Sequence, residues 1–115
     1  MAIKRFETGT RLSMAVAHGN TVYLAGVVAD DYALDAKGQT TQILAKIDKL
    51  LAAAGTDNTK MLSATIWLTD MRDFADMNSV WDKWVPKGCA PARACIESRL
   101  AVPTIKVEIR ITAAI

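Results

Sequence analysis

The sequence predicts an α+β domain in which two helices pack on one face of a mixed β-sheet. Apolar residues recur at helical spacing between residues 43 and 54, and they alternate with polar residues between 105 and 112. The predicted elements also follow one another in the order hairpin, helix, strand, helix, strand, strand. With 115 residues, 51% of them hydrophobic, the chain is predicted to form one domain over residues 1–115 with its own core.

The first predicted elements are a β-hairpin and a helix. Two short strand-like runs between residues 13 and 26 are separated by His18, Gly19 and Asn20, which favour a tight turn. A polar loop is expected from about residue 30 to 38. Gly55 is placed to end the helix that follows. The apolar positions that predict this helix are Ile43, Leu44, Ile47, Leu50, Leu51 and Ala54.

The middle of the chain predicts a strand and a second helix. Residues 61–70 alternate, which places Leu62, Ala64, Ile66 and Leu68 on one face and Met61, Ser63, Thr65 and Trp67 on the other. Asp70 is a suitable N-cap for a helix that runs to about Trp84 and is ended by Pro86 and Gly88. Its apolar stripe consists of Phe74, Met77, Trp81 and Trp84.

The two final strands carry ionisable side chains on one face. Residues 91–99 alternate Arg93, Cys95 and Glu97 with Ala94 and Ile96. In the last strand the apolar positions Ile105, Val107, Ile109 and Ile111 alternate with Lys106, Glu108, Arg110 and Thr112. If the apolar residues face the helices, the opposite face of the sheet carries Thr65, Trp67, Arg93, Cys95, Glu97, Glu108 and Arg110.

Composition excludes several classes of function. The net charge of +2 comes from 14 basic and 12 acidic residues spread along the chain, which argues against nucleic acid as a partner. No apolar run is long enough to span a membrane, and the N-terminus "MAIKRFETGT" lacks the apolar core of a signal peptide, so a cytoplasmic protein is expected. Cys89 and Cys95 fit neither a zinc site nor a disulfide scaffold. No metal or cofactor is predicted.

Two interpretations of the ionisable face stand side by side. It can be solvated, with Glu97 paired to Arg93 or Arg99, and Glu108 paired to Lys106 or Arg110. Alternatively, a second copy of the chain covers it, as the presence of Trp67 and Cys95 favours. In an interface pocket, Arg93 could hold a carboxylate through two parallel hydrogen bonds.

The stretch "CAPARACIESRL" followed by "KVEI" resembles the P-x-R-x-C-x-E…L…K-[IV]-E-I signature of the RidA/YjgF reactive-intermediate deaminase family. The resemblance covers nearly the whole chain, and "GTRLSMAVAHGNTVYLAG" and "WDKWVPKGCAPAR" are most similar to the YoaB-like branch. It implies a chorismate-mutase-like α+β fold and a homotrimer with clefts between subunits. It also implies cofactor-independent hydrolysis of 2-aminoacrylate-type enamines or 2-imino acids to 2-keto acids and ammonia.

The resemblance also implies roles for particular residues. Arg93 would bind the substrate carboxylate, Cys95 would line the pocket, and Glu108 would hold the attacking water. Leu12 and Ala25 stand where the archetypal branch has a tyrosine and a serine, and Arg11 is a candidate substrate-binding replacement. The missing hydroxyls leave open an alternative function, a non-catalytic trimer that binds small carboxylates such as 2-keto acids. Cys95 is not expected to act as a nucleophile, because the sole histidine, His18, lies in a predicted turn.

Overall fold

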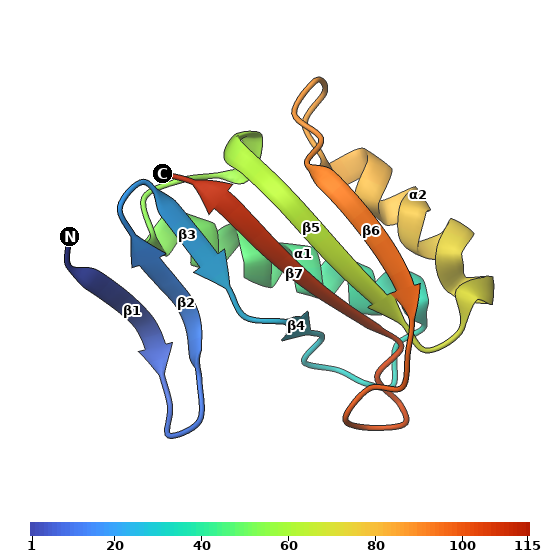
Figure 1. The fold of residues 1–115 in the computed structure, drawn as a ribbon. Coiled ribbons are helices and arrows are strands. Elements are labelled where there is room, and N and C mark those ends of the chain that lie inside the picture. Colours follow the sequence, from blue (N-terminus) through green and yellow to red (C-terminus); the bar gives the residue numbers. More distant parts are fainter.

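In the computed structural model, which describes residues 1–115, both helices lie behind a single twisted sheet (Figure 1). The sheet has the strand order β1-β2-β3-β7-β5-β6, and the short β4 also pairs with β7. The helices are α1 (Ala36–Ala53) and α2 (Phe74–Trp84). The strands are β1 (Ile3–Thr8), β2 (Ser13–His18), β3 (Thr21–Leu24), β4 (Val27–Val28), β5 (Met61–Leu68), β6 (Ala92–Glu97) and β7 (Val107–Ala114). The predicted α+β class is confirmed.

The hairpin and the last strand form as predicted. Strands β2 and β3 pair around Gly19, whose φ of 62° is the left-handed conformation that the turn requires. The inward side chains of β7, from Val107 to Ala113, are buried against the helices. Strands β1 and β4 were not predicted, because β1 is an almost fully exposed edge strand and β4 has only two residues.

Helix α1 begins earlier than its apolar pattern indicates. The Asp35 side chain accepts a hydrogen bond of 2.8 Å from the Gly38 amide, so the helix starts at Ala36 and Gly38 lies in its first turn. Gly55, at φ 84°, follows its C-terminal end as expected. The first helix therefore includes the end of the predicted loop.

Two details of the middle segment differ from prediction. A register shift between Met61 and Ser63 turns Met61 into the core (7% exposed) and leaves Leu62 outside (51% exposed). Asp70 caps a 3₁₀ turn over Met71–Asp73, accepting from the Arg72 amide, and α2 begins only after this turn. Ala64, Ile66 and Leu68 are buried as predicted.

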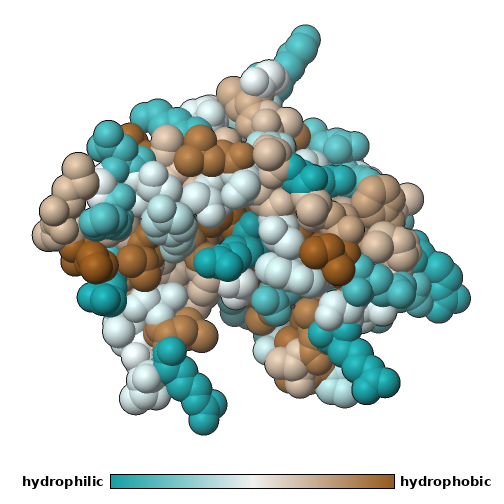
Figure 2. All heavy atoms as spheres, in the orientation of Figure 1, coloured by the Kyte–Doolittle hydropathy of each residue, from teal (hydrophilic) through white to brown (hydrophobic).

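The core lies between the sheet and the two helices, and the other face of the sheet is uncovered. Figure 2 shows this uncovered face, on which hydrophobic and hydrophilic side chains are interspersed. Tyr23, Leu62 and Ile96 are large hydrophobic side chains exposed in the single chain. Neither helix is both long and apolar enough to cross a membrane.

Candidate functional site

Strand β6 shows the main difference between the predicted and the observed sheet. It runs parallel to β5 after the crossover through α2, with Arg93 opposite Ala64, Cys95 opposite Ile66 and Glu97 opposite Leu68. Paired residues share a face, and these three β5 residues are in the core. Arg93, Cys95 and Glu97 therefore point to the helix side, and the prediction that they lie on the uncovered face is wrong. Ala94 and Ile96 lie on the uncovered face instead.

The orientation of β6 could not be predicted because this strand lies at the edge of the sheet. All of its residues except Cys95 are exposed, so burial does not distinguish its two faces. The register with β5, which β6 joins after the α2 crossover, decides which side chains turn inward.

Arg93 is held by helix α2. Its Nη1 donates a hydrogen bond of 2.8 Å to Oδ1 of Asn78. Its Cζ lies 5.4 Å from the centroid of the Trp81 ring and 5.9 Å from that of Phe74, within the range of cation–π attraction. None of the chain's three ion pairs includes Arg93. The exposed guanidinium therefore keeps free N–H groups and an unmatched positive charge.

Cys95 and Glu97 follow Arg93 on the same face of β6. Cys95 is half-buried against the core, and desolvation raises the pKa of its thiol, opposed in part by the Arg93 charge. A raised pKa keeps the thiol protonated, which is unfavourable for a nucleophile. Glu97 accepts a 2.8 Å hydrogen bond from the Met71 amide and forms no ion pair with Arg93 or Arg99.

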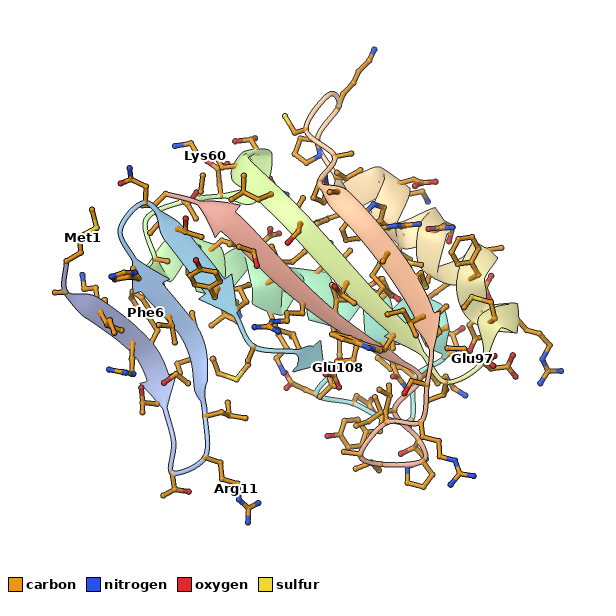
Figure 3. The ribbon with its side chains drawn as sticks, in the orientation of Figure 1. Met1, Phe6, Arg11, Lys60, Glu97 and Glu108 are labelled. Carbon is orange, nitrogen blue, oxygen red and sulfur yellow. The ribbon has the colours of Figure 1, made fainter.

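Glu108 lies on the uncovered face, opposite Val28 of β4 and Trp67 of β5 (Figure 3). Any side chain at position 26 would collide with its Oε2, so Gly26 leaves room for the carboxylate. Burial raises the pKa of Glu108. The carboxylate has no ion pair, and the Arg110 Nε instead donates to the Leu24 carbonyl at 3.2 Å. The ion pairs of Glu108 with Lys106 or Arg110 that the solvated interpretation predicted are absent.

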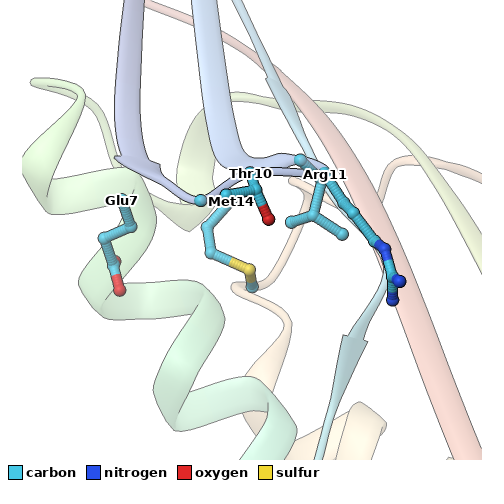
Figure 4. A pocket seen from close by; sticks show the side chains of 6 residues that line it. Glu7, Thr10, Arg11 and Met14 are labelled. Carbon is cyan, nitrogen blue, oxygen red and sulfur yellow. The ribbon is translucent and has the colours of Figure 1, made fainter.

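Arg11 lies at the tip of the β1–β2 hairpin (Figure 3). With Glu7, Thr10 and Met14 it lines an open pocket of about 340 Å³, and its guanidinium extends away from Glu7 (Figure 4). The hairpin and β6 lie at opposite edges of the sheet, so one chain does not bring Arg11 near Arg93. Leu12 occupies the same turn as Arg11, while Ala25 directly precedes Gly26 beside Glu108.

The single chain thus separates the predicted site residues. Arg93 and Cys95 face α2, whereas Glu108 is on the other face and β5 lies between β6 and β7. Arg93 and Glu108 therefore do not share a face, contrary to the prediction, and their strands β6 and β7 are not neighbours in the sheet. No group of three or more His, Cys, Asp or Glu side chains is arranged to hold a metal ion.

Sequence reasoning missed the helix residues that hold Arg93. Phe74, Asn78 and Trp81 are spaced i, i+4, i+7 and therefore form one stripe of α2. A polar asparagine inside an otherwise apolar stripe is the signal that could have marked this contact surface.

Comparison with known proteins identifies the class to which this fold and these residues belong. The family model described as Endoribonuclease L-PSP matches residues 2–115, and the chain belongs to this family, the RidA/YjgF family. A RutC family protein of Haemophilus ducreyi is 47% identical over 113 residues, covering 98% of this chain and 97% of that protein. The RutC family protein YoaB of Escherichia coli K12 is 44% identical over 115 residues, the full length of both.

Similarity to solved structures also places the chain in this family. A YjgF family protein from Neisseria meningitidis has a TM-score of 0.97 and 47% identity, covering 99% of this chain and 95% of that one. The resemblance to the YoaB-like branch is confirmed.

Proposed function

We propose that this protein hydrolyses enamine and imine intermediates, of the 2-aminoacrylate or 2-imino acid type, to 2-keto acids and ammonia. The observation that carries the proposal is the Arg93 guanidinium, which is exposed, anchored on α2 and unmatched by any carboxylate of the chain. Such a group is suited to bind a substrate carboxylate through two parallel hydrogen bonds. Membership of the RidA/YjgF family supports the assignment.

The active site is proposed to form between subunits of a homotrimer. Within one chain, Arg93 and Glu108 lie on opposite faces of the sheet, so a small substrate cannot contact both. A second copy that packs its uncovered face beside the β6 edge brings its own Glu108 toward Arg93 of the first. The exposed Tyr23, Leu62 and Ile96 on that face are the kind of surface that subunit contacts bury.

The proposed chemistry needs few groups. Arg93 holds the carboxylate of the imine, and Glu108 accepts a proton from water as the water oxygen forms a bond to the imine carbon. The C=N electron pair goes to nitrogen, which takes up a proton, and the resulting carbinolamine loses ammonia as the C=O bond forms. An enamine first gains a proton at carbon to become the imine. The raised pKa of Glu108 helps it to return the proton it accepts.

The test couples the protein to a dehydratase that generates 2-aminoacrylate and measures the release of keto acid. Arg93→Ala should abolish the acceleration. Arg93→Lys should also lose most of it, because an ammonium cannot form the two parallel hydrogen bonds that a guanidinium forms with a carboxylate. Arg99→Ala is the matched control, since Arg99 is an exposed arginine of the same segment without an ion pair. Full activity of Arg93→Ala would show that the site is wrong.

A second candidate is a trimer that binds small carboxylates without turnover. It is favoured by Leu12 and Ala25, which provide no hydroxyl where the archetypal branch has one. Calorimetry with pyruvate, run beside the deaminase assay, separates the two functions. Binding without acceleration of keto-acid release supports the second.

A further inference from the structure

Arg93 lies over an aromatic surface, and this surface is part of a longer chain of contacts. Below the guanidinium is Trp81, only 4% exposed, whose ring centroid is 5.3 Å from that of Trp84 at an interplanar angle of 51°. The Trp84 Nε1 donates a hydrogen bond of 3.0 Å to Oδ2 of Asp48 on α1. Trp81 is thus fixed between the guanidinium and a second indole that is itself tied to the neighbouring helix.

This arrangement differs from the usual way of holding an arginine. A carboxylate partner would neutralise the charge and occupy the in-plane N–H groups. An aromatic ring attracts the guanidinium through its face and leaves those N–H groups free. In this chain only Nη1 has a hydrogen-bond partner, the neutral amide of Asn78, so both the charge and the remaining donors stay available.

We infer that Trp81 is a positioning residue for the substrate carboxylate: its indole face orients the Arg93 guanidinium without neutralising it. This inference rests on the proposed function, because it assigns Arg93 a carboxylate ligand. It extends that function by making affinity for 2-keto and 2-imino acids depend on a buried tryptophan of α2.

The substitution that tests it is Trp81→Leu, with Trp81→Phe as the conservative variant that keeps an aromatic face. Trp81→Leu should weaken pyruvate binding about tenfold, raising KM for the imine with little change in kcat. Trp81→Phe should restore affinity to within about threefold of the natural protein. Met77→Ala controls for loss of core packing, since Met77 is a fully buried α2 residue: it should lower Tm while leaving pyruvate affinity unchanged.

A spectroscopic measurement tests the positioning directly. Protons on the Arg93 side chain above the indole face should show an upfield ring-current shift in NMR spectra, assigned with Arg93→Lys. In Trp81→Leu the shift should fall to the smaller contribution of the Phe74 ring, whose centroid lies 5.9 Å from the Arg93 Cζ. Trp81→Leu protein that binds pyruvate as tightly as the natural protein, or Trp81→Phe that binds as weakly as Trp81→Leu, would overturn the inference.

The failure of the proposed function gives a different pattern. If the natural protein neither binds pyruvate nor accelerates imine hydrolysis, the carboxylate role of Arg93 is wrong. The NMR shift then tests separately whether Trp81 orients the Arg93 guanidinium. An upfield shift supports this orienting role, and its absence overturns the role.

Discussion

Replacing Gln39 should destabilise the protein more than any other polar substitution on α1. Gln39 is fully buried, and its Nε2 donates to the carbonyls of Leu34 and Thr104 at 3.0 Å each. Its Oε1 accepts from the Lys106 amide at 2.9 Å. A longer bond of 3.3 Å reaches the Tyr32 carbonyl. One side chain therefore satisfies backbone groups of the loop before α1 and of the loop before β7.

The magnitude follows from these bonds. Gln39→Leu keeps most of the volume but leaves three backbone groups without their short hydrogen bonds, and each such bond contributes about 1 kcal/mol. The expected loss is about 3 kcal/mol in the free energy of unfolding, or roughly 10–20 °C in Tm for a domain of this size. Gln42→Leu makes the same chemical change about one turn later on α1. It loses only a hydrogen bond from the exposed Asp31 amide and should cost less than about 1 kcal/mol.

Urea unfolding of both variants at equal protein concentration measures the difference. A Gln39→Leu variant that is no less stable than Gln42→Leu would refute the reasoning, because it would show that water or local rearrangement satisfies the freed backbone groups.

Three further predictions concern charge and assembly. Hydrogen bonding to Arg72 lowers the pKa of Asp70 to about 2. The ionised Asp70 carboxylate therefore stabilises the fold at any pH above its pKa in the unfolded chain, about 3.9, and this stabilisation is lost as the pH falls toward 2. Asp70→Asn should lower Tm at pH 7 but not near pH 2, whereas Asp73→Asn, which removes no capping bond, should change Tm little at either pH. In the proposed homotrimer the exposed Ile96 is part of the subunit contact, so Ile96→Glu should leave the chain folded but shift sedimentation toward the monomer. Sedimentation identical to that of the natural protein would place Ile96 outside any subunit contact. RNA oligonucleotides should bind weakly, given the net charge of +2. Tight binding with a steep salt dependence would contradict the expectation that nucleic acid is not a partner.

The motif residues of the site were visible in the sequence, but their arrangement was not. Arg93 and Glu108 stand out by the family signature, and their lack of ion-pair partners agrees with a use other than surface solvation. Gln39 and Trp81 carried no local signal of their roles. A glutamine near a helix start is ordinarily exposed, and a tryptophan on an apolar stripe is ordinarily core.

The sequence by itself determined the elements whose two faces differ in hydrophobicity. Helix α1 and strand β7 each bury one face in the core. The spacing of their apolar residues therefore indicates both whether the segment is a helix or a strand and which of its faces is buried. Strand β6 lacks that contrast, because an edge strand is exposed on both faces. Only the tertiary structure, through the crossover of α2 and the register with β5, decided that Arg93 faces the helix and Glu108 the open side of the sheet.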